Sequence, residues 1–217
     1  MNRKRFSVHP TSVRLAGVYL TSHTHRRFPD KLAFLLNNRV RRLLAPPDQL
    51  ISRLGVRSND VAVDFGCGPG FYTIPLAKVA RRVIAVDVSP KMLEKVVANA
   101  KKHHTSVNHV QSDGSKIELE NASVDVILLV HVFHEIGEKA TVLGEFKRIL
   151  RDAGRLVIVE RAKGNVFSRK FGAPIMNVEH VISEVKQEAF ILAQRISLGD
   201  DAILIFQKTG NGNSSHT

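Results

Sequence analysis

Several residue types are scarce in this 217-residue chain, and each scarcity excludes a class of site. The single cysteine, Cys67, excludes an internal disulfide and any metal site built from several cysteines. No run of 18 or more apolar residues is present, which argues against a transmembrane helix, and no secretion signal is recognisable. We therefore expect a cytoplasmic protein without a membrane span, whose 43% hydrophobic residues suffice for one domain with a sizeable core.

Acidic residues are nearly absent from the first 42 positions. This segment contains ten Lys and Arg against one acid, Asp30, and so carries +9 of the chain's net charge of +12. The composition predicts a basic, flexible arm over residues 1–29, which is either a solvated extension or a contact for phosphate-rich partners such as RNA. Residues 1–29 also contain Arg, Ser and Thr without any acid, so organelle targeting is a minor alternative.

Hydrophobic periodicity predicts a single domain over residues 30–208 and a disordered tail at 209–217. Helical spacing of apolar residues over 30–44, and a shorter helix between Pro46 and Gly55, predict a helical cap at 30–58. Short apolar runs then alternate with helical segments. Strands are predicted at 60–65, 82–88, 107–113, 124–133 and 154–160, and helices from the glycine-rich loop to about 78, at 89–102 behind Ser89 as N-cap, at 138–150 and at 178–189.

This alternation is typical of an α/β fold, in which a parallel sheet is covered by helices on both faces. The last apolar segment, residues 190–208, is broken at Gly199–Asp200. It predicts a terminal hairpin that adds one antiparallel strand to the sheet.

Glycine is concentrated directly after the first predicted strand, in VAVDFGCGPGFYTIPLA, where Gly66, Gly68 and Gly70 alternate with other residues. A loop in this place lies at the carboxyl edge of the sheet, where open α/β folds bind ligands, and glycine lets the backbone approach a ligand closely. The spacing differs from the G-x-G-x-x-G of dinucleotide sites, and no Lys follows as in a P-loop. Two interpretations remain: the loop wraps a nucleoside that carries an amino-acid group, or it is a tight structural turn.

Three carboxylates end successive predicted strands: Asp64, Asp87 and Asp113. A carboxylate at Asp87 is placed to accept both hydroxyls of a ribose, at roughly 1.5–3 kcal/mol per charge-assisted bond. Asp113 is placed to accept an amino proton of adenine. Any one of them alone is better explained as a solvated loop residue, whereas the three together favour a nucleoside site.

The motifs VDFGCGPGFYTIPLA, VIAVDVSPKMLEKV, SDG, VDVILLVHVFHEI and FKRILRDAGRLVIVE together resemble the class I S-adenosylmethionine-dependent methyltransferases. The similarity is to the small-molecule branch that includes the menaquinone/ubiquinone-biosynthesis enzymes (methyltransferase type 11), and it covers residues 43–208. It implies a Rossmann-like, seven-stranded, mostly parallel sheet with a C-terminal antiparallel hairpin, and S-adenosylmethionine as the cofactor.

The resemblance also implies roles for single residues. Asp64, Gly66, Gly68 and Gly70 would hold the methionine end of the cofactor, Asp87 the ribose, Asp113 and Gly114 the adenine, with Val88 flanking the adenine ring and His131 beside the methionine and methyl group. The loop after the fifth strand departs from the Gly-Pro-Pro and Arg-Ile-Ser common in relatives, because it has FGAPIMNVEHVIS.

The segment HVFHEI supplies two candidate catalytic residues, His134 and Glu135, as base and orienter. A base is needed only if the acceptor is protonated at neutral pH. Local packing of His134 and helix capping by Glu135 are the alternatives, and no histidine or cysteine spacing indicates a metal site. The sequence predicts methyl transfer to a small-molecule acceptor; an RNA acceptor held by the basic arm, or a non-catalytic cofactor-binding partner subunit, are the alternatives.

Overall fold

The computed structural model describes residues 46–164 and 174–209. The predicted arm at 1–29, the predicted helix at 30–44 and positions 210–217 of the predicted tail lie outside the described residues. In chain order the elements are α3 (Pro47–Arg53), β1 (Val61–Phe65), α4 (Thr73–Ala77), β2 (Arg82–Asp87), α5 (Pro90–Lys102), β3 (Asn108–Gln111), β4 (Val124–Val130), the 3₁₀ helix η1 (Phe133–Glu135), α6 (Lys139–Ile149), β5 (Leu150–Arg161), α8 (Val178–Gln187), β6 (Phe190–Leu198) and β7 (Asp201–Lys208).

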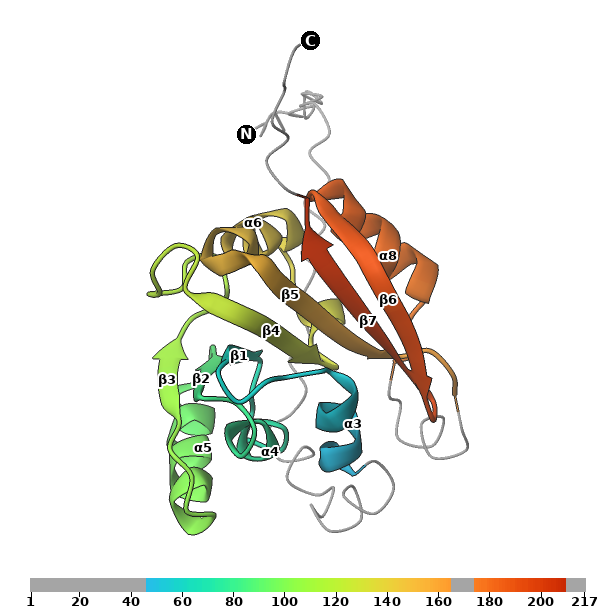
Figure 1. Cartoon of the computed structure of the whole chain (residues 1–217). Coiled ribbons are helices and arrows are strands. Elements are labelled where there is room, and N and C mark those ends of the chain that lie inside the picture. The colour runs from blue at the N-terminus through green and yellow to red at the C-terminus, as the bar shows by residue number, and fades with distance from the viewer. Residues whose placement is uncertain (1–45, 165–173, 210–217) are drawn as a thin grey trace, which may run out of the picture.

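The seven strands form one sheet in the order β3-β2-β1-β4-β5-β7-β6 (Figure 1). Strands β1 to β5 are mutually parallel, and β7 runs antiparallel to both of its neighbours, β5 and β6. The predicted seven-stranded, mostly parallel sheet with a C-terminal hairpin is confirmed. The chain reverses its direction of travel across the sheet between β1 and β4, and such a switch point opens a crevice at the carboxyl ends of the two strands.

Apolar residues bury both faces of the sheet. One face packs against α6 and α8, whose buried residues, such as Phe146 and Val181, share a core with Val63 and Ile127. The other face packs against α3 and α4, with Leu50 and Leu76 among its buried residues, and α5 covers Ala85 of β2 through Leu93 and Val96. Burial on both sides explains why β1 and β4 are almost continuous apolar runs.

Three local expectations were wrong. The fourth strand ends at Val130 and not at Phe133, because His131 takes a left-handed conformation (φ 57°) and the chain then forms η1. The fifth strand begins at Leu150, which pairs with Val124 before a shift in register. The third strand ends at Gln111, so Asp113 lies in the loop that follows it and not at its end. The prediction of Ser89 as the N-cap of α5 is confirmed, although its side chain makes no capping hydrogen bond.

Candidate functional site

The glycine-rich loop after β1 is anchored on the end of β2. The backbone N–H groups of Gly66 and Cys67 both donate to the carbonyl of Val86, at 2.8 and 3.1 Å, and Gly70 donates to the carbonyl of Cys67 at 3.0 Å. Gly66, Gly68 and Gly70 have φ values of 71°, 52° and 93°, a region that side chains with a Cβ rarely adopt. The backbone conformation therefore favours glycine at all three positions.

The three glycines differ in what surrounds them. A Cβ at Gly66 would lie 2.5 Å from Val132 Cγ2, and one at Gly70 would lie 2.6 Å from Val96 Cγ2. A Cβ at Gly68 would meet nothing within 4 Å. Gly66 and Gly70 are thus packed against the protein, whereas Gly68 leaves an open space in which a ligand can contact its backbone.

Asp87, at the end of β2, ties this loop to the start of α5. Its Oδ2 accepts from the backbone N–H of Gly68 and its Oδ1 accepts from the backbone N–H of Ser89, both at 2.9 Å. Each carboxylate oxygen has two lone pairs, so both retain capacity for a further donor such as a ribose hydroxyl. The structure thus joins Asp87 to the backbone of the one loop glycine whose Cβ position is open.

Asp64 lies beneath the loop and not in its open space. Its side chain is 3% exposed, and Oδ2 accepts a 2.5 Å hydrogen bond from the Thr73 hydroxyl at the start of α4. Burial raises the pKa of Asp64 to about 6, the Thr73 hydrogen bond counteracts this, and the charge of Asp87 adds to the increase. Burial, with the charges of Asp64 and Asp87, also raises the pKa of Cys67, so this thiol is no nucleophile at neutral pH.

The next strand end presents the residues predicted to meet an adenine. Asp113 Oδ1 accepts from the Ser115 hydroxyl at 2.7 Å and the Ser115 backbone at 3.0 Å, and these bonds lower the pKa of the Asp113 carboxyl. Gly114 has φ 94°, and a Cβ there would lie 2.7 Å from the Phe65 ring. Val88 is 49% exposed, which is unusual for a valine that follows a buried strand. An ionised carboxylate and an exposed apolar side chain thus follow two adjacent strands.

Histidines and a buried glutamate meet where β4 and β5 end. Glu160, near the end of β5, is 1% exposed, and both its carboxylate oxygens lie within 3.2 Å of Nδ1 of His134 in η1. Oε1 also accepts from the His134 backbone N–H at 3.3 Å. His131 Nδ1 lies 3.9 Å from Glu160 Oε2, and its Nε2 lies 3.3 Å from Asp201 Oδ2 on β7. Four side chains thus form one row, Asp201–His131–Glu160–His134.

The two predicted catalytic residues are close, but they do not form the tightest pair. His134 Nε2 lies 3.8 Å from Oε1 of Glu135, whose side chain is 56% exposed. Burial lowers the pKa of His134, and the positive charge of Lys139 lowers it further. The hydrogen bond and charge of Glu160, together with the charge of Glu135, raise the pKa by more, so the pKa of His134 lies above its usual value.

Sequence reasoning did not identify Glu160, although a signal was available. Like Asp64 and Asp87, it is an acid at the end of a buried apolar strand. Such an acid is costly to bury unless it is paired, so its partners identify it as part of a site. Those partners, on other elements, could be known only from the tertiary structure.

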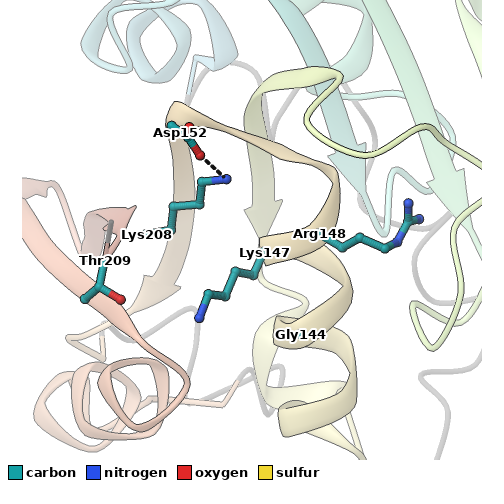
Figure 2. A pocket seen from close by; sticks show the side chains of 6 residues that line it. All are labelled: Gly144, Lys147, Arg148, Asp152, Lys208 and Thr209. Atoms are coloured by element: carbon teal, nitrogen blue, oxygen red, sulfur yellow. Dashed lines mark ion pairs between the residues drawn. The ribbon is translucent and has the colours of Figure 1, made fainter. Parts of the chain in front are cut away.

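A cavity of about 310 Å³ lies near the start of β5 and the end of β7, away from the glycine loop. It is lined by Gly144, Lys147, Arg148, Asp152, Lys208 and Thr209 (Figure 2). Its charges are largely satisfied: Lys208 pairs with Asp152 at 2.8 Å, and Arg148 pairs with Glu145 at 2.6 Å. Lys147 and Arg148 extend to different sides of α6 (Figure 2). The cavity is therefore separate from the candidate site.

The comparisons with known proteins agree with this geometry. Residues 63–158, which include the glycine loop and the ends of β2 to β4, match the family model described as "Methyltransferase domain". The chain is 30% identical over 165 residues to a carboxy-S-adenosyl-L-methionine synthase of Yersinia enterocolitica. These matches support a class I S-adenosylmethionine-dependent methyltransferase domain of the type 11 branch in this chain. S-adenosylmethionine is the cofactor of this family.

The similarities differ in how much of each chain they cover. The alignment with the Yersinia protein covers 70% of this chain and 61% of that relative, so the chain spans about six tenths of its length. A Mycobacterium tuberculosis protein named "Probable S-adenosylmethionine-dependent methyltransferase" is 33% identical over 96 residues, 44% of this chain and 34% of that protein. The crystal structure of an S-adenosylmethionine-dependent methyltransferase from Aquifex aeolicus matches 83% of this chain and 98% of that one, with a TM-score of 0.74 and 21% identity, and so shares the fold of this methyltransferase domain.

The residues at the carboxyl edge fit the family's cofactor. The Cβ position of Gly68 is open, the Asp87 carboxylate has spare acceptor capacity, and Val88 is exposed, so the chemistry of these residues is compatible with a nucleoside. Within residues 46–164 and 174–209, no three His, Cys, Asp or Glu side chains are grouped so that they could hold a metal ion. No helix in that part of the chain is long and apolar enough to cross a membrane.

Proposed function

We propose that this chain transfers a methyl group from S-adenosylmethionine to a small-molecule acceptor. The observation that carries the proposal is the environment of Gly68: its N–H donates to Asp87 at 2.9 Å, and apart from the adjacent residues nothing lies within 4 Å of the position that a Cβ would take. The match to the methyltransferase family supports the same cofactor. The glycine loop is proposed to hold its methionine end through Gly68, with Gly66, Gly70 and the buried Asp64 supporting the loop from the protein side. Asp87 is proposed to hold its ribose, Val88, Asp113 and Gly114 its adenine, and His131 the region of the methyl group.

The bound cofactor supplies an activated methyl group on a positively charged sulfur. The protein then contributes mainly orientation, which is worth roughly 7–11 kcal/mol in favourable intramolecular reactions. His134 is proposed as a base for acceptors that must lose a proton, with Glu135 beside it. The row that contains His134 lies next to the loop, because Val132 contacts the position of a Cβ at Gly66.

The first experiment follows methyl-labelled S-adenosylmethionine in a cell extract divided into small-molecule, RNA and protein fractions. The full chain is compared with Asp87→Ala and with the control Asp48→Ala, which changes an exposed aspartate on α3. We expect label in the small-molecule fraction, stoichiometric S-adenosylhomocysteine, loss of both with Asp87→Ala, and no change with Asp48→Ala.

Other destinations of the label would replace this proposal with a named alternative. Label in RNA that disappears with rising salt and on deletion of residues 1–29 would make the basic arm a substrate contact. Label retained on a sulfonium nucleoside of increased mass would indicate modification of the cofactor itself, as the name of the Yersinia relative suggests for that protein. Cofactor binding without any labelled product would identify a non-catalytic module.

A further inference from the structure

The row Asp201–His131–Glu160–His134 spans the ends of three neighbouring strands, β4, β5 and β7, and the start of η1. Glu160 is its centre and is almost fully buried, at 1% exposure. An ionised carboxylate at such a place is stabilised only by its hydrogen-bond partners. Those partners are the Nδ1 atom and the backbone N–H of His134, with His131 Nδ1 further away at 3.9 Å.

The contact with Glu160 favours one tautomer of His134. An ionised carboxylate is only an acceptor, so beside it Nδ1, at 3.1 Å from Oε2, is the nitrogen that donates. In the neutral ring Nε2 is then the basic atom, and the His134 side chain is 18% exposed. The charged and titratable groups around this ring are Glu160 and Arg161 from β5, His131 at the end of β4, Glu135 from η1, Lys139 from α6 and Asp201 from β7.

We propose that Glu160 is a positioning residue that makes Nε2 of His134 a general base, and that the acceptor is therefore a small molecule with a weakly acidic hydroxyl. This inference rests on the proposed function. An uncharged amine or a thioether can be methylated without prior loss of a proton, so neither needs such a pair. A phenolic or enolic hydroxyl does, because its oxygen becomes a good nucleophile only as the proton leaves.

The transfer is balanced without any further reactant. The new bond joins the acceptor oxygen to the methyl carbon, and the electron pair of the broken carbon–sulfur bond stays on sulfur. The hydroxyl proton passes to His134 Nε2, and the resulting imidazolium is stabilised by Glu160 at Nδ1. The imidazolium then releases the proton to water. Glu160 keeps its charge throughout, as the buried carboxylate of a Ser-His-Asp triad does.

The first test does not depend on the acceptor. The full chain is labelled with ¹⁵N-histidine, the His134 signals are assigned with His134→Gln, and the ring is titrated by NMR. We expect the wild type to show the Nδ1–H tautomer, and Glu160→Gln to lower the His134 pKa, because an opposite charge within hydrogen-bond distance is lost. Glu138→Gln, the same change at an exposed residue that precedes α6, should leave the His134 titration unchanged.

The second test uses the small-molecule fraction of a cell extract with methyl-labelled S-adenosylmethionine, and measures initial rates against pH. We expect Glu160→Gln to lose at least about 10-fold in rate and to move the acidic limb of the profile to lower pH, with S-adenosylmethionine affinity by calorimetry unchanged. Glu138→Gln should behave as the wild type. Thermal unfolding checks that the variants fold, and Glu160→Asp, which keeps the charge, should restore part of the rate.

Two results would overturn the inference. One is a His134 titration that Glu160→Gln does not move. The other is a rate loss that is equal at every pH, or that follows Glu135→Gln and not Glu160→Gln. Absence of labelled product from the wild type would instead contradict the proposed function, and the NMR titration would still decide the role of Glu160.

Discussion

The carboxylate of Asp87 accepts a 2.9 Å hydrogen bond from the backbone N–H of Gly68, so the end of β2 holds the middle of the glycine loop. The other carboxylate oxygen holds the start of α5 through Ser89. One side chain therefore determines the relative position of the two backbone segments that flank the proposed ribose site.

Replacement of Asp87 by Asn should weaken cofactor binding. Asparagine offers one acceptor oxygen in place of two, so either Gly68 or Ser89 loses its partner and the charge is lost as well. We expect S-adenosylmethionine affinity to fall about 10- to 100-fold by calorimetry, with about 1–3 kcal/mol lost from the free energy of unfolding. Wild-type affinity in Asp87→Asn would show that the carboxylate does not contact the ribose.

Alanine substitutions should distinguish the structural roles of Gly66 and Gly70 from the proposed binding role of Gly68. Gly68→Ala should lower the free energy of unfolding by only about 1–2 kcal/mol, because alanine is strained in a left-handed conformation. Its methyl group would occupy the open space and should abolish cofactor binding. Gly66→Ala and Gly70→Ala add clashes with Val132 and Val96, and should lose more stability, by about a further 1–3 kcal/mol. Urea unfolding and calorimetric titration of the three variants check this. If Gly68→Ala binds like the wild type, the space beside Gly68 is not the cofactor site.

The buried Asp64 should make stability depend on pH in an unusual direction. Its pKa is raised from 3.8 to about 6, so the folded state holds the proton more tightly than the unfolded state. The contribution of Asp64 to the free energy of unfolding is therefore fully present below pH 4, falls as the pH rises towards 6, and is lost above that value. The loss amounts to about 3 kcal/mol.

Asp64→Asn should remove this part of the pH dependence. The variant should match the wild type near pH 4 and exceed its free energy of unfolding by up to about 3 kcal/mol at pH 7, because Asn accepts from Thr73 without carrying a charge. Urea unfolding at a series of pH values measures both curves. Parallel curves for the two proteins would contradict the raised pKa.

The salt bridge between Arg155 and Asp60, near the start of β1 and away from the glycine loop, should affect stability and not cofactor binding. Arg155 on β5 donates to the carbonyls of Leu54 and Gly55 at 2.9 and 3.0 Å and pairs with the buried Asp60 at 3.2 Å. Arg155→Met leaves Asp60 without this cation and should cost about 3–5 kcal/mol.

The matched control is Arg195→Met, which breaks an exposed pair with Glu179 and should cost less than about 1 kcal/mol. Cofactor affinity should be unchanged in both variants. An affinity loss in Arg155→Met would mean that this salt bridge and the proposed cofactor site are energetically coupled.

Much of the architecture could be predicted because its signals are local. Apolar runs over 61–65 and 124–130, which are buried on both faces, predicted central parallel strands, and the break at Gly199 predicted the hairpin. The end of β4 could not be predicted, because HVF continues the apolar run and nothing local shows that His131 adopts φ 57°. The partners of His131 lie on other strands: its backbone N–H donates to the carbonyl of Val159 on β5, and its ring lies near Glu160 and Asp201.

The sequence by itself determined the fold class, the position of the glycine loop and the carboxylates at the strand ends, because spacing along a strand or turn is a property of neighbouring residues. Only the tertiary structure decided which glycine has open space at its Cβ position and which carboxylate contacts His134. Those properties depend on Val132, Val96 and Glu160, whose distance from the loop and from η1 is set by the order of strands in the sheet and not by their order in the chain.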